Sequence, residues 1–270
     1  MQIEDCGLQV RGSEPLPREF AEVVEREQAR LGPLGARIFY FPSIGSTNDV
    51  ASALAVAGNG QGSVVVADAQ TAGRGRRGRT WFSPPLSGLY VSVVLEPPPA
   101  ARTLVSLAAG VALSEGVQAA TGLSTDIKWP NDLLVGSRKL AGILAEAVPP
   151  DAVVLGYGIN AGVESYPPEL KPRATSLERE LGRPVDRAAL FVETLAALAR
   201  RYGDLVEGRF DVILDAWRER SPGSRGRRVT WETPTGVRSG TTAGIDEQGA
   251  LLVSVGDKVE RLIAGEVVWL

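Results

Sequence analysis

The stretch Gly73–Trp81 holds the densest group of residues in this sequence that could carry chemistry. It contains four arginines and three glycines, and it ends in an aromatic residue. Glycine lets a backbone approach a ligand closely, and the arginine guanidinium offers a planar set of donors that matches phosphate or carboxylate. Because so many cations repel one another without a counter-ion, we interpret the stretch as a loop that binds a polyanion.

Two known phosphate-binding patterns fit this loop only in part. Gly73, Gly75 and Gly78 have the spacing of a dinucleotide-binding fingerprint, and positions 73–80 come close to a P-loop. Both patterns require a helix directly after the loop, whereas the chain continues here as Phe-Ser-Pro-Pro over 82–85. A solvated, arginine-rich surface turn therefore stays an alternative for the loop taken alone.

Composition limits the kinds of reaction that this chain could catalyse. The 270 residues include no histidine and a single cysteine, Cys6. Without histidine the chain lacks the commonest general base and metal ligand, and serine–histidine and cysteine–histidine nucleophiles are excluded. Positioning and charge stabilisation remain, as in phosphoryl or nucleotidyl transfer. A net charge of −3 favours a small anionic ligand over a nucleic acid.

Several features indicate a cytoplasmic protein. A single cysteine cannot form an intrachain disulfide. The N-terminus lacks the pattern of a signal peptide, and we expect no stretch to be apolar enough to span a bilayer.

The length of the chain exceeds that of a usual single domain, which predicts a large domain and a smaller one. We expect an N-terminal arm over 1–35 with one helix that starts at Pro17, too short for a helix-turn-helix domain. A catalytic domain follows over 36–222, and a small all-β domain covers 223–270. The segment 221–224 (Ser-Pro-Gly-Ser) is the predicted linker between them.

Hydrophobic periodicity and turn residues predict the elements of both domains. Residues 1–16 are expected to be irregular. The predicted helices cover 17–31, 49–57, 103–120, a segment capped by Asp186, and 210–220. The predicted strands cover 38–41, 64–69, 88–95, 126–135, 138–146 and 152–159, followed by 227–231, 237–245, 250–255 and 258–263.

Polar clusters fall at strand ends or in adjacent loops of the predicted catalytic domain, where α/β proteins build ligand sites. Some have simpler explanations: residues 45–49 could be an ordinary helix cap, and Lys139 could protect an edge strand from aggregation. Together, however, the clusters indicate one ligand site. They are Ser46-Thr47-Asn48, Gln70 with the loop 73–81, Lys128–Asp132, Lys139 and Asn160.

With these motifs in order, the sequence resembles the biotin protein ligases (biotin–[acetyl-CoA-carboxylase] ligases) over about residues 36–270. The resemblance rests on Ser46-Thr47-Asn48, Gln70-x-Ala72-Gly73-Arg74-Gly75-Arg76-x-Gly78-Arg79-x-Trp81, Lys128-Trp129-Pro130-Asn131-Asp132, Arg138-Lys139-Leu140-Ala141-Gly142-Ile143-Leu144, Gly158-Ile159-Asn160 and Gly244-Ile245-Asp246. It implies an α/β (mixed-sheet) catalytic domain of the biotin/lipoyl ligase type with a small C-terminal β-barrel.

The resemblance also implies a two-step reaction. Biotin and ATP would give biotinyl-5′-AMP, and the biotin would then pass to a lysine of a biotin carboxyl carrier protein. Lys139 and Arg74 would be catalytic, and Asp132 would hold Mg²⁺. The residues that the resemblance assigns to biotin or ATP are Ser46, Thr47, Asn48, Gln70, Gly73, Arg74, Gly75, Arg76, Trp81, Lys128, Asn131, Lys139, Gly142 and Asn160.

Family members that repress transcription carry an N-terminal winged helix domain, whereas about 35 residues precede the catalytic region here. We therefore expect a short form without that domain, with no specific DNA binding and no membrane partner. The oligomeric state stays open, with a homodimer among the alternatives. Two rival functions remain: a lipoate or octanoate protein ligase of the same fold, and a nucleic-acid-binding module that uses the arginine loop.

Overall fold

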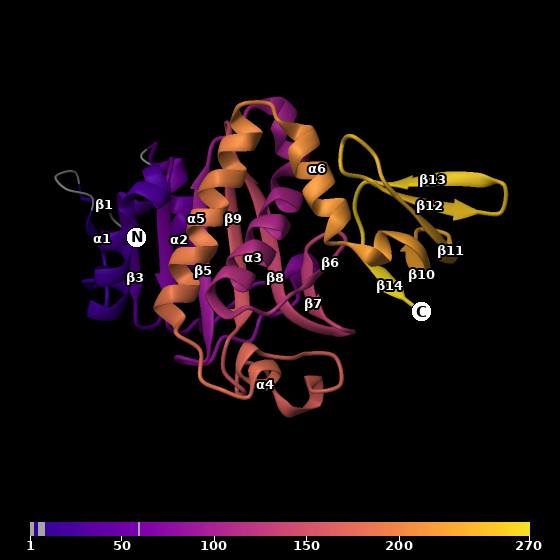
Figure 1. Cartoon of the computed structure of the whole chain (residues 1–270). Helices are drawn as coiled ribbons and strands as arrows, with labels where there is room; N and C mark the ends of the chain where they lie inside the picture. The colour runs from indigo at the N-terminus through magenta and orange to yellow at the C-terminus, as the bar shows by residue number, and fades with distance from the viewer. Residues whose placement is uncertain (1–2, 5–8, 59) are drawn as a thin grey trace.

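The computed structural model describes residues 3–4, 9–58 and 60–270 (Figure 1), so that Cys6 lies outside the described residues. In this part of the chain the main layer is a seven-stranded mixed sheet of order β3-β4-β5-β9-β8-β7-β6. β3 and β4 run parallel, and every other neighbouring pair is antiparallel. The strands are β3 (Arg37–Phe41), β4 (Ser63–Ala67), β5 (Gly88–Leu95), β6 (Asp126–Lys128), β7 (Asp132–Val135), β8 (Arg138–Val148) and β9 (Ala152–Asn160).

Helices cover the two faces of this sheet unequally. The helices α1 (Arg18–Leu31), α3 (Val105–Thr121), α5 (Arg187–Val206) and α6 (Phe210–Glu219) share one core with one face of the sheet. In Figure 1, α3, α5 and α6 lie together in front of the strands. A single long helix, α2 (Thr47–Val56), packs on the opposite face through a second and smaller core. Much of that second face is therefore left for a site.

Alternation along β5, β8 and β9 determines which side chains point to the α2 face. Gly142, Gly156 and Gly158 occupy this face on β8 and β9, where Gly142 pairs with Gly158. A Cβ atom on Gly158 would lie 2.3 Å from Trp81 Nε1, and one on Gly156 would lie 2.0 Å from Asn48 Oδ1. Glycine inside a strand often marks such a close approach. The three glycines thus leave a trough in the surface of the sheet. The side chains of Trp81 and Asn48 lie directly on the sheet backbone there.

A β-bulge in β8 determines where Lys139 points. Strict alternation would place Lys139 on the same face as Ala141 and Ile143, towards α3. The pairing of β7 with β8 instead shifts between Leu133/Leu134, so that Leu140 is an additional residue. A bulge re-aims the side chains on either side of it. Lys139 consequently shares the trough face with Gly142.

The C-terminal residues form a five-stranded antiparallel sheet of order β13-β12-β11-β10-β14. Its strands are β10 (Arg225–Thr233), β11 (Gly236–Ile245), β12 (Leu251–Val255), β13 (Lys258–Leu262) and β14 (Val267–Trp269). In Figure 1 this sheet lies beside α6 and β6. The small all-β domain and four of its strands are confirmed, and β14 was not predicted.

The predicted linker is a short turn that packs on Trp269 of the C-terminal sheet. It forms the 3-10 turn η5 (Pro222–Ser224), and Ser221 and Ser224 are buried. A Cβ atom on Gly223 would lie 2.5 Å from the Trp269 ring, which leaves no space for a side chain there. The boundaries at residues 35 and 222 stay predictions.

Most of the predicted elements of the catalytic domain are confirmed to within a few residues, and the differences lie at its margins. Residues 1–16 were expected to be irregular, and this is wrong: β1 (Ile3–Glu4) pairs with β2 (Gln9–Val10). Val10 is buried in the core on the α2 side of the sheet, and this burial explains why the segment forms a regular strand. The short elements η1 (Gly32–Gly35), η2 (Arg76–Gly78), η3 (Pro99–Leu104), η4 (Pro168–Leu170) and α4 (Leu177–Leu181) were not predicted.

The expectation that no stretch is apolar enough to span a membrane was also wrong. By length and composition, Pro99–Thr121 meets that criterion. Its apolar residues are explained by the core, because 67% of its most apolar window is buried inside the protein.

We predict opposite stability changes for alanine at two helical glycines. A Cβ atom on Gly116 in α3 would lie 2.5 Å from the Thr194 Cα atom in α5, and that backbone cannot give way cheaply. Gly116→Ala should therefore lower the free energy of unfolding by about 1–3 kcal/mol. Gly203 in α5 has nothing within 4 Å of such an atom, so Gly203→Ala should raise it by about 0.5–1 kcal/mol. Urea unfolding followed by circular dichroism measures both, and equal shifts would refute the prediction.

Candidate functional site

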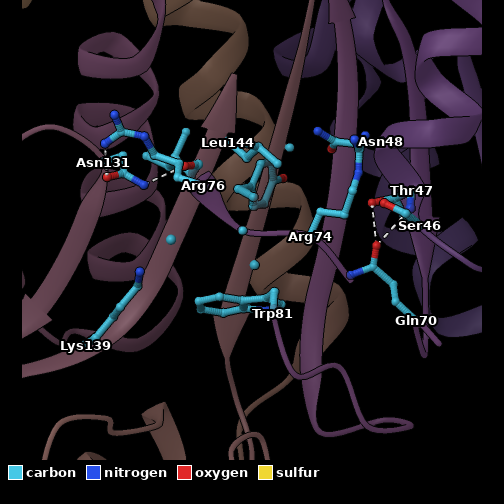
Figure 2. Close-up of a pocket in the computed structure, with 16 residues that line it drawn as sticks. Ser46, Thr47, Asn48, Gln70, Arg74, Arg76, Trp81, Asn131, Lys139 and Leu144 are labelled. Atoms are coloured by element: carbon cyan, nitrogen blue, oxygen red, sulfur yellow. Dashed lines mark hydrogen bonds between the residues drawn. The ribbon is translucent and has the colours of Figure 1, made fainter. Parts of the chain in front are cut away.

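A pocket lies over the glycine trough on the α2 face (Figure 2). Its two ends differ in chemistry. In Figure 2, Ser46, Thr47 and Gln70 lie at one end, and Lys139 and Asn131 lie at the other. The residues that line the pocket are Ser46, Thr47, Asn48, Gln70, Arg74, Gly75, Arg76, Trp81, Asn131, Lys139, Gly142, Ile143, Leu144, Gly156, Tyr157 and Gly158.

The first end, which we call the neutral end, is built from uncharged donors and acceptors at the start of α2. The Thr47 amide donates to Gln70 Oε1 at 2.8 Å, and Gln70 Nε2 donates to Ser83 Oγ at 2.9 Å. Ser92 Oγ lies 2.8 Å from Thr47 Oγ1 and 2.5 Å from Asn48 Oδ1. These bonds fix the orientation of each polar group, which suits recognition of a neutral polar ligand.

Helix capping does not explain the polar start of α2. Ser46 occupies the N-cap position, but its side chain makes no capping hydrogen bond. Ser46, Thr47 and Asn48 are all buried and all line the pocket. The simpler explanation considered from the sequence is therefore wrong for Ser46.

The second end, which we call the cationic end, contains two positive side chains. Lys139 Nζ lies 2.6 Å from Asp132 Oδ1 and 5.4 Å from the centroid of the Trp81 ring. Arg76 Nη1 donates to Asn131 Oδ1 at 3.0 Å, and Asn131 Nδ2 donates in turn to the Ile143 carbonyl at 2.8 Å. Burial lowers the pKa of the Arg76 guanidinium. An anion at this end would add charge-assisted hydrogen bonds to two partly buried cations.

Lys139 is held by backbone pairing on both sides, with Leu134 of β7 on one side and with residues 173–175 on the other. Its amide donates to the Arg173 carbonyl at 2.8 Å, and its carbonyl accepts from the Thr175 amide at 2.9 Å. β8 lies between β7 and β9 in the sheet, so the interpretation of Lys139 as an edge-strand gatekeeper is wrong.

The indole of Trp81 lies between the two ends, along the glycine trough. Its Nε1 atom is buried and has no hydrogen-bond partner among the described residues. A buried N–H without a partner is costly.

The loop 73–81 is folded back on itself. The Trp81 amide donates to the Gly73 carbonyl at 2.9 Å, and the Gly75 amide donates to the Arg79 carbonyl at 2.7 Å. Arg77 and Gly78 form its tip with positive φ values of 58° and 74°. A Cβ atom on Gly73 would lie 2.4 Å from the Trp81 carbonyl oxygen, so glycine is required there by packing.

The arginines of the loop are partnered within the protein, which corrects the expectation that they need an external polyanion. Arg79 Nη1 donates to Glu266 Oε1 at 2.8 Å, and this bond lowers the pKa of Glu266. Arg77 lies 4.0 Å from Glu232. Both carboxylates belong to the C-terminal residues, so the C-terminal sheet helps to neutralise the loop. Of the loop arginines, Arg74 and Arg76 line the pocket.

Four of the predicted site residues do not line the pocket. Gly73 shapes the loop, and Asp132 lies behind Lys139 as its ion-pair partner. Lys128 Nζ lies 5.6 Å from the centroid of the Trp269 ring. Burial lowers the pKa of the Lys128 ammonium, and the negative charges of Asp132 and Glu266 raise it by a smaller amount. Asn160 is buried, and its Nδ2 donates to the Thr175 carbonyl at 2.9 Å. The other predicted residues meet in the pocket.

The sequence reasoning missed five pocket-lining residues and one carboxylate behind them. The glycines at 156 and 158 were the available signal, because they interrupt an otherwise apolar strand. The missed residues are Ile143, Leu144, Gly156, Tyr157 and Gly158, with Glu146 behind the neutral end.

Two family models match the chain in order. Residues 40–163 match the biotin/lipoate A/B protein ligase family, and residues 225–269 match the biotin protein ligase C terminal domain. These ranges contain the pocket and the C-terminal sheet, respectively.

Individual proteins are also similar to this chain over most of its length. The biotin--[acetyl-CoA-carboxylase] ligase of Mycobacterium tuberculosis is 40% identical, with 84% of this chain and 86% of that protein covered. The bifunctional ligase/repressor BirA of Bacillus spizizenii is 35% identical, with 93% and 79% covered. The biotin protein ligase from Aquifex aeolicus, solved in complex with biotin and ATP, superposes with a TM-score of 0.76 at 27% identity, covering 87% of this chain and 99% of that one.

These relatives are 35% and 40% identical to this chain over most of both sequences, and the solved structure shares its fold. The chain belongs to the biotin protein ligase family.

Proposed function

We propose that this protein is an ATP-dependent biotin–protein ligase. In the first step, a biotin carboxylate oxygen attacks the α-phosphorus of ATP, which gives biotinyl-5′-AMP and releases pyrophosphate. In the second step, a lysine amine of a biotin carboxyl carrier protein attacks the acyl carbon, and AMP leaves. Neither step needs a protein nucleophile, which agrees with a chain that contains no histidine.

The observation that carries this proposal is the division of the pocket into a neutral end and a cationic end. Biotin is a neutral bicyclic ring with amide-like groups, joined by a chain to a carboxylate. Thr47, Asn48 and Gln70 offer oriented donors and acceptors for the ring, and Lys139 and Arg76 offer charge for the carboxylate and the phosphates. The trough between the two ends suits an apolar chain against Trp81.

In this mechanism the cationic end lowers the repulsion between two anions. Biotin carboxylate and the α-phosphate must come into contact before attack, and positioned positive charges make that contact possible. Lys139, held by the bulge and by Asp132, is the group that we assign to the developing charge. Arg76 and Asn131 form a second donor pair on the same side.

We further propose that Mg²⁺ enters with the ATP phosphates. The described residues contain no group of three acidic, cysteine or histidine side chains that could hold a metal. Mg²⁺ usually takes one or two carboxylates with substrate phosphates and water. Asp132 is the carboxylate that would serve at the cationic end, and it would have to give up its ion pair with Lys139 to do so. The ion would neutralise phosphate charge and favour pyrophosphate departure.

A lipoate or octanoate ligase is the alternative within the same fold. The matched C-terminal domain and the relatives named above favour the biotin ligase over it. The hydrogen-bonded neutral end also favours biotin, because a lipoyl or octanoyl group carries no amide to match it.

A thermal shift and a transfer assay test the proposed function directly. Ligands that bind the folded state at 100 times their Kd stabilise it by about 2.7 kcal/mol. Biotin with ATP should therefore raise the melting temperature clearly, whereas lipoate with ATP or RNA should not. ATP-dependent labelling of a carrier domain lysine with biotin is the decisive measurement, and failure to label would overturn the proposal.

Lys139→Ala should cripple the first step without unfolding the protein. Removal of one preorganised charge at a reacting centre typically reduces the rate roughly 10²–10³-fold. Biotin-dependent pyrophosphate release measures that step, and the exposed Lys258→Ala variant is the matched control. Near-normal release by a folded Lys139→Ala protein would contradict the assignment.

We also predict that α1 does not support sequence-specific DNA binding. Its apolar side packs on α5, where Phe20 contacts the Phe191 ring and Arg30 donates to both Glu193 carboxylate oxygens at 2.8 and 2.7 Å. Acidic residues outnumber basic ones in α1, so this helix would repel the phosphates of DNA. A gel-shift titration with genomic fragments, biotin and ATP at physiological salt should show no specific complex, and a biotin-dependent one would disprove the prediction.

A further inference from the structure

Ser92 lies beneath the neutral end of the pocket but does not line it. It belongs to β5 and is fully buried. Its Oγ atom lies 2.8 Å from Thr47 Oγ1 and 2.5 Å from Asn48 Oδ1. A hydroxyl carries one proton, so Ser92 can donate in only one of these two hydrogen bonds. The choice between them decides what Thr47 offers to a ligand.

The side-chain amide of Asn48 determines this choice. Asn48 Nδ2 donates to Glu146 Oε2 at 2.7 Å, and an ionised carboxylate can only accept. The amide is therefore turned with its oxygen towards Ser92. Because an amide oxygen carries no proton, Ser92 is the donor in the 2.5 Å hydrogen bond. The only proton of the Ser92 hydroxyl is used there.

Thr47 is consequently the donor in its own hydrogen bond with Ser92. Without a proton between them, two hydroxyl oxygens 2.8 Å apart would bring only lone pairs together. The proton of the Thr47 hydroxyl is thus directed to Ser92, beneath the pocket. Towards a ligand, Thr47 Oγ1 offers lone pairs and acts as an acceptor.

Gln70 places a second acceptor beside Thr47. Its Nε2 atom donates to Ser83 Oγ at 2.9 Å, and its Oε1 atom accepts from the Thr47 amide at 2.8 Å. Gln70 Oε1 lies 3.1 Å from Thr47 Oγ1, as Figure 2 shows. With the Thr47 proton committed to Ser92, both of these oxygens are acceptors. An N–H group of a ligand satisfies such a pair, whereas a ligand oxygen at the same place meets only lone pairs.

We propose that Ser92 is a positioning residue for ligand selection. Its hydroxyl sets the direction of the hydrogen bonds beneath the neutral end and thereby keeps Thr47 an acceptor. The site then selects a ring that carries an N–H donor, as the cyclic urea of biotin does, and rejects a ring with oxygen in that position. This inference rests on the proposed biotin ligase function and specifies what fixes the selectivity of that site.

Calorimetric titration without ATP tests the proposal on three ligands: biotin and its two cyclic carbamate analogues, each with oxygen in place of one urea N–H. In the wild type, the analogue with oxygen opposite Thr47 should bind at least about 100-fold more weakly than biotin, because it leaves two buried acceptors unpaired. In Ser92→Ala, the Thr47 proton is free to turn to the ligand. Biotin should then bind about 5–10-fold more weakly, whereas that analogue should bind at least as well as before.

Ser114→Ala is the matched control. Ser114 is also a buried serine, and its Oγ atom lies 2.9 Å from Thr125 Oγ1. It belongs to α3, on the opposite face of the sheet. Ser114→Ala removes the same kind of hydroxyl and should leave all three affinities unchanged. Ser92→Cys is the second variant: its thiol is a weaker donor of similar shape, and it should change the ratio of affinities in the same direction by a smaller factor.

Steady-state kinetics separate this role from catalysis. Ser92→Ala should raise the KM for biotin with kcat changed less than about threefold, because the cationic end is intact. An equal loss of affinity for biotin and both analogues would show that the neutral end is only loosened, and it would overturn the proposal, as would unchanged affinities. A wild-type protein that binds biotin but labels no carrier domain would instead overturn the proposed function, so the two failures can be distinguished.

Discussion

The structure depends on a constraint at the middle of the sheet: one face must stay bare enough for a ligand to lie on the backbone. Gly142, Gly156 and Gly158 satisfy this constraint, since a Cβ atom on either of the last two would collide with Asn48 or Trp81. The other face of the same strands carries large apolar residues that pack against α3 and α5. The sheet is therefore stabilised from one side while the opposite side holds the site.

Charge in the site is arranged so that repulsion among the cations of the loop does not open it. Arg79 and Arg77 are placed near carboxylates of the C-terminal sheet, and Arg74 lies between Asp49 and Glu146. Lys139 has Asp132. Arg76 donates to an uncharged partner, Asn131 Oδ1. The cationic end can then attract an anion locally in a protein whose net charge is −3.

The C-terminal sheet is part of this arrangement. Trp129 Nε1 donates to the Gly249 carbonyl at 3.0 Å, and Trp269 packs on Gly223 and lies near Lys128. These contacts join the Lys128–Asp132 motif and the basic loop to the same small domain. The C-terminal domain therefore contacts the outer side of the cationic end.

Much of this protein could be predicted from the sequence alone. Apolar runs and turn residues located most strands and helices, because burial patterns and glycine or proline turns are local properties. Motif types and spacing located the neutral end, the loop and Lys139, because strand ends and helix starts gather such groups at one edge of a sheet. The absence of histidine, which the composition shows directly, limited the kinds of catalysis that the chain could perform.

Tertiary structure alone decided the rest, since it depends on contacts between residues far apart in the chain. The additional residue at Leu140, which turns Lys139 into the trough, exists only in the pairing of β7 with β8. Arg74 and Glu146 are 72 residues apart, and Arg79 and Glu266 are 187 apart. No local pattern shows that such carboxylates neutralise the loop, because their positions follow from how the whole sheet and the C-terminal domain fold together.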